Sequence, residues 1–223
     1  MRERIAQACA ATHRPADSVR LLAASKTFSA DRVREAAAAG QHDFGESYAQ
    51  EGVEKINATR DLPLTWHFIG PIQSNKTRPI AERFDWVHSV DREKIARRLS
   101  EQRPAGQEPL QTCIEVNISG EASKSGVAPA DLLALAKSIA SLPGLRLRGL
   151  MAIPEPTDDM ALQRRRFAHL RELLHQLKEA LAQEGLVLDT LSMGMSADLE
   201  AAIAEGATIV RVGTAIFGER TKA

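Results

Sequence analysis

Hydrophobic and polar positions along the chain follow two patterns that alternate. Short, nearly continuous apolar runs are separated by longer runs rich in Ala, Leu, Glu and Arg, in which apolar residues recur at helical spacing. Continuous apolar runs such as Leu21-Leu22-Ala23-Ala24 are typical of strands covered on both faces, as in a parallel sheet. The runs predict strands at Val19–Ser25, His42–Gly45, Thr65–Ile69, Trp86–Ser89, Gln111–Asn117, Leu145–Ala152, Thr190–Met193 and Thr208–Val212.

Helices are predicted between the strands, and several of their ends carry local signals. Ser29 and Gly40 mark the two ends of one helix, and Asp91 is expected to cap another. Pro79 predicts a break or a short helix after the third strand, and Gly185 ends the longest helix. The predicted helices are Glu3–Ala11, Ser29–Gly40, Ser47–Ile56, Ser74–Arg83, Asp91–Gln102, Pro129–Ser141, Asp158–Glu184 and Ala197–Glu205.

Strands that alternate with helices indicate an α/β fold built from parallel βαβ units. Eight such units predict a closed (β/α)₈ TIM barrel, with the helix at Glu3–Ala11 as an extra N-terminal element. The alternative is an open, doubly wound sheet, but no Gly-x-Gly-x-x-Gly follows the first strand, which disfavours a dinucleotide-binding version. No linker divides the chain, so we expect residues 1–223 to form a single domain.

Composition and charge exclude several classes of function. The chain has 29 Lys and Arg against 29 Asp and Glu, and only 4% aromatic residues, so we expect no nucleic-acid partner. No apolar run is long enough to cross a membrane, and the first residues lack the apolar core of a secretory signal. Two cysteines and six scattered histidines predict neither a disulfide framework nor a metal site. We therefore expect a cytoplasmic globular protein.

Lys26 is the first candidate for chemistry, because it ends the first predicted strand and follows an apolar run. In a TIM barrel the functional groups lie at the C-terminal ends of the strands. A lysine that is partly desolvated there has a lowered pKa and can form a Schiff base with a carbonyl compound. The alternative is an ordinary surface lysine.

The loops after the last two predicted strands are candidates for a phosphate site. Ser196 offers a hydroxyl and adjacent backbone N–H groups, Gly213 allows a close approach of the backbone, and Thr214 adds a second hydroxyl. Barrel phosphate sites recur after strands 7 and 8. The alternative for Ser196 is simple capping of the next helix. Together with Lys26, these loops indicate a phosphorylated aldehyde as the ligand.

The positions of several further residues along the predicted strands and loops make them candidates for the site or for the core. Arg211 lies within the last apolar strand, and if buried it needs a partner, either a ligand or a carboxylate such as Glu115. His67 is either a residue at the mouth of the barrel or a hydrogen-bonded core histidine, and the second interpretation is favoured. Asn117 is a candidate ligand donor or a turn residue, Met151 is expected to pack in the core, and residues 123–126 are expected to form a polar loop over the site with Lys124 as a charged group.

Motifs along nearly the whole chain resemble those of the pyridoxal 5′-phosphate (PLP) homeostasis protein family. The matching segments occur in order and together are highly specific. They are Ala24-Ser25-Lys26-Thr27, Phe44-Gly45-Glu46-Ser47-Tyr48 with Gln50-Glu51, Trp66-His67-Phe68-Ile69-Gly70-Pro71-Ile72-Gln73-Ser74-Asn75-Lys76, Ser123-Lys124-Ser125-Gly126, Arg148-Gly149-Leu150-Met151-Ala152-Ile153-Pro154, Leu191-Ser192-Met193-Gly194-Met195-Ser196 and Arg211-Val212-Gly213-Thr214-Ala215-Ile216-Phe217-Gly218.

The resemblance implies a barrel similar to the N-terminal domain of alanine racemase, with PLP held as a Schiff base on Lys26. It also implies that Ser196, Gly213 and Thr214 hold the phosphate and that Arg211 faces the pyridine nitrogen, where a cation disfavours protonation and weakens the ring as an electron sink. The remaining cofactor-binding candidates are Ser47, His67 and Met193. Ser47 departs from the family, which usually has Asn at this position.

The resemblance leaves two functions to compare, a PLP carrier and a PLP-dependent racemase or lyase. Racemisation needs an acid or base on each face of the substrate carbon, and alanine racemase takes one from a tyrosine in a separate domain. This chain ends at Ala223 without such a domain, and its only tyrosine is Tyr48. We therefore expect a non-enzymatic protein of PLP homeostasis. The expected partners are PLP and PLP-dependent apo-enzymes, and the expected state is a monomer or weak dimer.

Overall fold

The strands form a closed parallel barrel in a computed structural model that describes residues 1–119 and 125–218. Neighbouring strands pair in chain order, and β8 pairs with β1 to close the ring. The predicted (β/α)₈ barrel is therefore confirmed and the open sheet is excluded. The strands are β1 (Arg20–Ala24), β2 (Asp43–Glu46), β3 (Thr65–Phe68), β4 (Trp86–Val90), β5 (Leu110–Glu115), β6 (Leu145–Met151), β7 (Thr190–Ser192) and β8 (Ile209–Val212).

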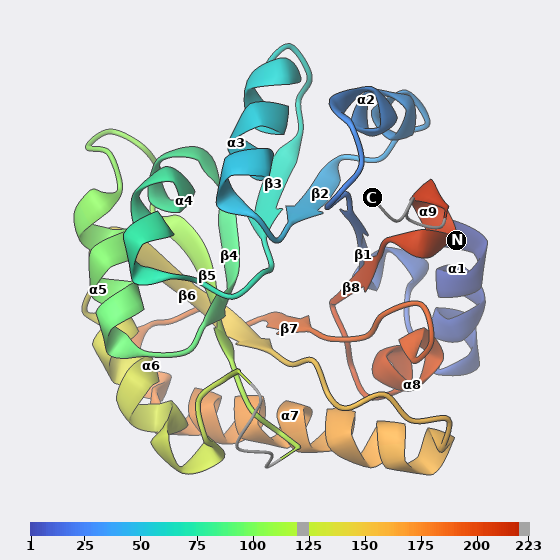
Figure 1. Cartoon of the computed structure of the whole chain (residues 1–223). Coiled ribbons are helices and arrows are strands. Elements are labelled where there is room, and N and C mark those ends of the chain that lie inside the picture. The colour runs from blue at the N-terminus through green and yellow to red at the C-terminus, as the bar shows by residue number, and fades with distance from the viewer. Residues whose placement is uncertain (120–124, 219–223) are drawn as a thin grey trace.

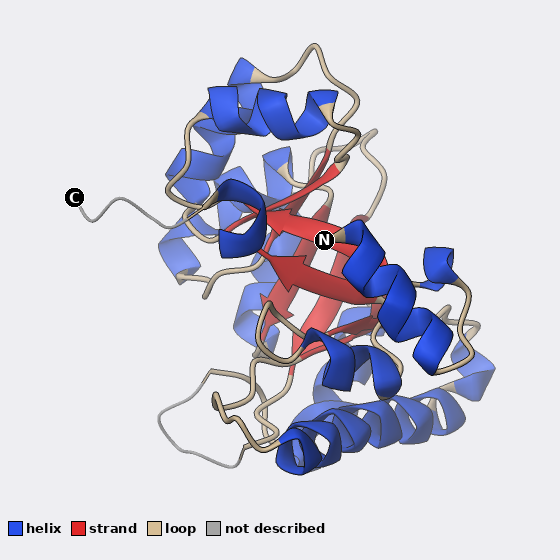
Figure 2. Cartoon of the chain, turned by 90° about the vertical axis from the view of Figure 1, so that its right-hand side faces the viewer, coloured by secondary structure: helices blue, strands red, loops and turns tan. Residues whose placement is uncertain are grey.

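Helices surround the barrel on the outside, as Figures 1 and 2 show. Each predicted helix is present, with ends that differ by a few residues. The α-helices are α1 (Arg2–Ala11), α2 (Ala30–Ala38), α3 (Ala49–Ala58), α4 (Thr77–Arg83), α5 (Glu93–Gln102), α6 (Leu132–Ala140), α7 (Met160–Ala180), α8 (Leu199–Ala204) and α9 (Thr214–Phe217), and single 3₁₀ turns lie at Ala16–Ser18, Ser74–Lys76, Pro129–Asp131 and Ala182–Glu184.

Two local predictions can be compared with the observed helices, and one short helix was not predicted. The helix that contains Pro79 is short, as expected, and Pro79 lies in its first turn, where its missing N–H costs no helical hydrogen bond. The prediction that Asp91 caps α5 is wrong, because Arg92 is the N-cap residue and the Asp91 carboxylate instead accepts a hydrogen bond from Arg92 Nη1 at 2.6 Å. Helix α9 was not predicted, because its single turn is too short to give a helical pattern.

The apolar core includes the inward faces of the surrounding helices. Helix α7 illustrates the pattern, since Phe167, Leu170, Leu174 and Leu177 recur at helical spacing and are all buried. Each such side chain contributes about 1.5–3 kcal/mol when it is removed from water. Within the described ranges, no helix has the length and apolar character needed to span a membrane.

The extra N-terminal helix α1 packs beside α8 (Figure 1). Arg4 of α1 forms an ion pair with Glu200 of α8 and donates from Nη1 to the Ser196 carbonyl at 2.9 Å. Arg14, which follows α1, donates to the carbonyls of Ile203 and Ala207, each at 2.7 Å. The start of the chain is therefore fastened to the loop between β7 and α8.

Candidate functional site

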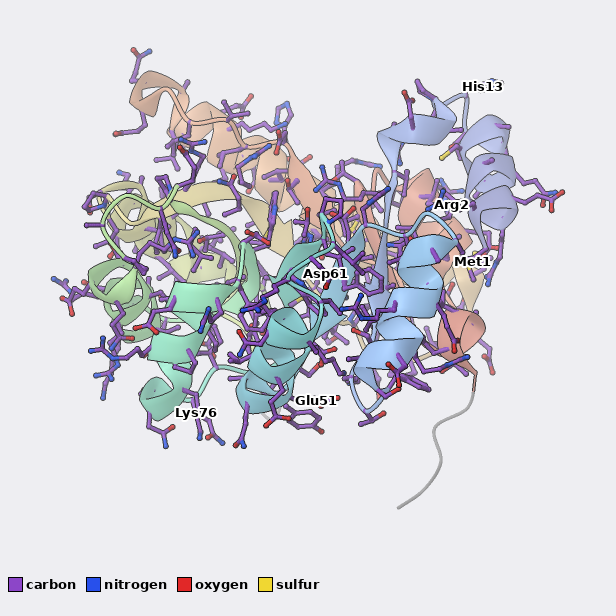
Figure 3. The ribbon with its side chains drawn as sticks, turned by 90° about the horizontal axis from the view of Figure 1, so that it is seen from above. Met1, Arg2, His13, Glu51, Asp61 and Lys76 are labelled. Atoms are coloured by element: carbon purple, nitrogen blue, oxygen red, sulfur yellow. The ribbon has the colours of Figure 1, made fainter. Side chains whose placement is uncertain are left out.

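The predicted site residues on β1, β2 and β8 meet at the C-terminal rim of the barrel. Ala24 pairs with Gly45 and Ala23 with Val212, so the segments that follow these strands emerge at similar heights. Lys26 and Ser47 line a cavity of about 450 Å³ at this rim, together with Tyr48, Gly70, Lys76 and Ile153. The lining of this cavity does not include Ser196, Arg211, Gly213 or Thr214. Figure 3 shows Glu51 and Lys76 at one edge of the molecule and His13 at the opposite edge.

Lys26 lies just beyond β1 and is half-buried, as expected for a lysine at a barrel mouth. The residues on either side of it are held by the protein. Ser25 is fully buried and accepts a hydrogen bond at its carbonyl from Lys55 Nζ at 2.7 Å. Thr27 has a left-handed φ of 71° and donates its backbone N–H to Glu51 Oε1. The backbone that carries Lys26 is thus fixed on both sides.

A buried ion pair beside Lys26 was not predicted from the sequence. Lys55 Nζ lies 2.8 Å from Glu46 Oε1 and 2.6 Å from Glu51 Oε1, and Ser25 Oγ donates to Glu46 Oε1 at 2.6 Å. Burial raises the pKa of the Glu46 carboxyl, and hydrogen bonds from Lys55 and Ser25 oppose that rise. The signals that could have found the cluster were Glu46 in the Gly-Glu-Ser-Tyr motif and the i, i+4 spacing of Glu51 and Lys55 on α3.

The proposed phosphate-binding residues lie in adjacent loops. Ser192 of β7 pairs with Ile209 of β8, so the loops that carry Ser196 and Gly213 leave neighbouring strands at the same rim. Gly213 packs against β1, since a Cβ added there would lie 3.1 Å from the Ala24 carbonyl oxygen. Thr214 is exposed at the start of α9. Ser196, Gly213 and Thr214 therefore lie on the same side of the rim as the end of β1.

Ser196 does not cap α8, so that alternative is wrong. The N-cap residue is Asp198, whose Oδ1 accepts the backbone N–H of Met195 at 2.6 Å across the loop. Burial raises the pKa of the Asp198 carboxyl, opposed by its hydrogen bond from Met195 and by the charge of Arg211. Ser196 is instead fixed through its carbonyl by Arg4 of α1.

Arg211 is buried in β8 and has polar protein partners. Its Nη1 donates to the Ser192 carbonyl at 2.7 Å and to Ser192 Oγ at 2.8 Å, and its Nη2 donates to the Ala152 carbonyl at 2.9 Å. The alternative that it forms a salt bridge with Glu115 is wrong, since Glu115 acts on it only through longer-range charge. Burial lowers the pKa of the guanidinium to about 10, so it stays charged at neutral pH.

Glu115, at the end of β5, carries a perturbed carboxyl. Burial and the nearby charge of Asp91 raise its pKa to about 7, and Arg211 partly opposes the rise. A carboxyl that titrates near neutral pH beside a candidate site is a typical feature of functional sites. The sequence named Glu115 only as a possible partner of Arg211.

His67 and Met193 do not line the rim cavity. Both are fully buried, and the two ring nitrogens of His67 are bonded to Asp43 and His88. This is the hydrogen-bonded core histidine that the sequence favoured. Met151 is also fully buried, as expected for a packing residue. The predicted loop residues Ser123 and Lys124 lie outside the described residues, and the backbone N–H of Asn117 donates to Val127.

The family model described as "Alanine racemase, N-terminal domain" matches residues 1–221. The match includes all eight strands of the closed barrel. Fold and rim together therefore define a barrel domain of the alanine racemase N-terminal type.

Curated relatives and solved structures narrow this class. A "Pyridoxal phosphate homeostasis protein" of Pseudomonas aeruginosa is 65% identical over 217 residues, which cover 97% of this chain and 91% of the relative. PipY of Synechococcus elongatus, solved with PLP bound, is 41% identical with a TM-score of 0.83, and the match covers 96% of this chain and 100% of that one. PipY without PLP gives a TM-score of 0.85 at the same identity and coverage. The chain belongs to the pyridoxal phosphate homeostasis protein family.

Proposed function

We propose that this chain binds PLP at the C-terminal rim of the barrel, holds it as a Schiff base on Lys26 and carries it in the cytoplasm without catalytic turnover. The observation that carries the proposal is the placement of Lys26 on the same rim as the loops that contain Ser196, Gly213 and Thr214. The PLP-bound structure of the related PipY supports the same ligand.

The rim offers a cavity beside Lys26 and polar groups that match the two ends of PLP. A cavity of about 450 Å³ lies within the usual range of roughly 300–1,000 Å³ for small-molecule sites. Lys26 supplies the amine that an aldehyde needs, and Ser196 and Thr214 supply hydroxyl donors for a phosphate. Gly213 packs closely on Ala24, which leaves no room for a side chain between the loop and β1. Ser47 lines the same cavity as Lys26 and is proposed as a further polar contact.

Arg211 gives the site its expected bias against carbanion chemistry. PLP supplies an electron sink when its pyridine nitrogen is protonated. A guanidinium that remains charged disfavours a second positive charge beside it. Arg211 is proposed as the group that faces this nitrogen, and it therefore favours retention of the cofactor over turnover. His67 and Met193, being fully buried, are proposed to support the site from within the barrel and not to touch the ligand.

A racemase remains the second candidate, because Tyr48 lines the same cavity as Lys26. Tyr48 is 59% exposed, and within the described ranges its hydroxyl has no hydrogen-bond partner. A general base works best when it is held within reach of the proton it removes. The solvated, unsupported phenol therefore favours the carrier. Incubation with L- and D-amino acids should give no sustained loss of optical activity above that of free PLP; a sustained rate that Tyr48→Phe abolishes would establish the racemase instead.

The absorbance spectrum of the protein with PLP tests the Schiff base directly. The Lys26→Ala variant should lose the visible absorbance band of the lysine adduct, since no other amine replaces it at the same position. Lys76→Ala is the matched control, because Lys76 lines the same cavity and should leave the band unchanged. A band that persists in Lys26→Ala would refute the proposed linkage.

Release of PLP to an acceptor tests the carrier function. The loaded protein should restore activity to a PLP-dependent apo-enzyme, and borohydride reduction of the Schiff base beforehand should prevent the transfer because the reduced bond to Lys26 cannot hydrolyse. Equal restoration by the reduced protein would show that the PLP came from elsewhere than Lys26.

A further inference from the structure

A continuous line of hydrogen-bonded side chains runs through the inside of the barrel to Arg211. Ser192 Oγ lies 2.8 Å from Arg211 Nη1 and 2.7 Å from His88 Nδ1. His88 Nε2 lies 2.9 Å from His67 Nδ1, and His67 Nε2 lies 3.1 Å from Asp43 Oδ1. Ser192, His88 and His67 are fully buried. The line joins five strands and connects the start of β2 with the rim half of β8.

With both histidines neutral, the two ends of this line determine which atom donates in each hydrogen bond. A guanidinium can only donate and a carboxylate can only accept. Ser192 Oγ therefore accepts from Arg211, and its own proton is donated to His88 Nδ1. His88 must then carry its proton on Nε2 and donate to His67 Nδ1. His67 in turn carries its proton on Nε2 and donates to Asp43.

This arrangement requires both histidines to be neutral, since a doubly protonated His67 would donate from Nδ1 to His88 and reverse the direction of the line. Burial lowers the pKa of His67, although Asp43 opposes that effect. Burial lowers the pKa of His88 well below its ordinary value, and the charges of His67 and Arg211 add to the effect. The electrostatics and the geometry therefore agree.

The rings are also held by packing. His67 stacks on Trp86 with ring centroids 5.5 Å apart and planes 15° apart, and it meets His88 edge-on at 5.1 Å. Arg20 and Arg148 lie over Trp86 at 6.0 and 5.3 Å from its ring centre. A ring flip of either histidine would break two hydrogen bonds at once.

We propose that Ser192, His88, His67 and Asp43 are positioning residues for Arg211. His88 accepts the Ser192 proton, so the hydroxyl can present only a lone pair to the guanidinium. Asp43 and His67 fix His88 in the tautomer that makes this possible. The line thus sets the orientation in which Arg211 meets a ligand at the rim. Its relevance to PLP depends on the proposed function, but its effect on Arg211 does not.

Nitrogen-15 NMR of the protein without PLP tests the tautomers. Both His67 and His88 should be neutral with the proton on Nε2 at neutral pH. Asp43→Asn removes the anionic acceptor and should give His67 mixed tautomer signals. Asp189→Asn is the matched control, because Asp189 also forms an ion pair with an arginine, Arg148, but lies outside the line. A wild-type spectrum with either histidine protonated on Nδ1 would overturn the proposal.

Ser192→Ala tests the effect on Arg211. The variant keeps both backbone acceptors of Arg211, the carbonyls of residue 192 and Ala152, so it separates orientation from burial. Resolved Nη proton signals of Arg211 in the wild type should be lost, and PLP retention should fall about tenfold, as expected for one hydrogen bond to a charged group. Ser192→Thr restores the hydroxyl and should restore both properties.

The two proposals fail in different ways. If Ser192→Ala leaves the Arg211 signals, the His88 tautomer and PLP retention unchanged, the positioning proposal is overturned. If the wild-type protein does not retain PLP but shows the expected tautomers and Arg211 signals, the proposed function fails and the positioning of Arg211 stands.

Discussion

Individual ionisable residues around the rim show how the barrel changes ordinary side-chain chemistry. Glu115, Glu46 and Asp198 are carboxyls whose pKa values are raised chiefly by burial, and each lies near an arginine or lysine that only partly compensates. The cost of burying these groups falls on the stability of the fold. Two residue-scale predictions measure that cost.

The free energy of unfolding should fall as pH rises because of Glu115. Its pKa is 4.5 in an ordinary environment and about 7 in the folded chain, so the folded state holds the proton more tightly. This contribution is fully present below about pH 4.5 and is lost as pH rises through about 7, by about 3 kcal/mol at most. Glu115→Gln should remove this contribution. Urea unfolding across this pH range should therefore show the free energy of unfolding of the variant increasing relative to that of the wild type as pH rises. Glu101→Gln, at an exposed position of α5, should show the same pH dependence of the free energy of unfolding as the wild type. Parallel curves for Glu115→Gln would contradict the assignment.

Lys55 should be costly to remove because it is the buried partner of Glu46. Lys55→Met leaves a buried carboxylate without its cation, which should lower the free energy of unfolding by about 4 kcal/mol. Lys55→Met with Glu46→Leu removes both charges and should recover part of the loss. Denaturant unfolding measures the effect, with Arg78→Met in the exposed pair with Glu82 as control, expected to change stability by less than about 1 kcal/mol. Equal effects in the two single variants would show that the Lys55 pair is solvated.

Helices and strands contribute through their ends, where backbone groups need partners outside the regular structure. Helix α7 was predicted to begin at Asp158, but it begins at Met160 with Asp159 as its N-cap. The pattern located the helix correctly and misplaced its start, because two adjacent aspartates carry the same capping signal. Only the observed backbone shows which carboxylate reaches the free N–H groups.

Asp159→Ala should destabilise the protein by about 1 kcal/mol, the usual value for loss of an N-cap. Asp159 Oδ1 accepts from Ala161 N at 2.9 Å and from Leu162 N at 3.1 Å. Asp158→Ala is a closely matched control, since Asp158 is exposed, adjacent and without a hydrogen bond among the described residues. Thermal or urea unfolding compares the two. A larger loss of stability in Asp158→Ala would show that Asp158, and not Asp159, caps the helix.

At the scale of the whole molecule, the first helix of the chain supports the loop that follows the seventh strand. Arg4 contacts both Ser196 and Glu200, which lie almost two hundred residues away in sequence. The N-terminal helix is thus part of the rim architecture as well as an extra covering element. The expected monomer or weak dimer stays a prediction, which size-exclusion chromatography at several concentrations can test.

Arg4→Ala should weaken PLP retention by a few-fold with a loss of stability below about 1 kcal/mol, because the Arg4–Glu200 pair is partly exposed. The cause is loss of the hydrogen bond to the Ser196 carbonyl, which frees the loop proposed to hold the phosphate. Equilibrium dialysis with PLP measures the change. Arg34→Ala, which removes a similarly exposed ion pair with Asp61, is the control and should leave retention unaltered. No difference between the two variants would mean that α1 does not support the loop.

The sequence by itself determined the barrel and the position of Lys26. Strands covered on both faces must be apolar throughout, so the local apolar runs predict the number and order of the strands. The residue that follows each run must then lie at the rim. The small-residue loops around Ser196 and Gly213 followed by the same logic. These features depend on neighbours within about ten residues, which a linear pattern contains.

Only the tertiary structure decided which polar side chains meet. His88 and Ser192 are 104 positions apart, and nothing in either segment indicates that they share a hydrogen bond. The partners of Arg211 proved to be Ser192 and Ala152 and not Glu115, because strand register sets what faces a buried guanidinium. Lys55 likewise reaches Glu46 and Ser25 only because α3 packs back on β2. Hydrogen bonds and ion pairs act over a few ångströms in space, and barrel closure alone brings such distant residues within that range.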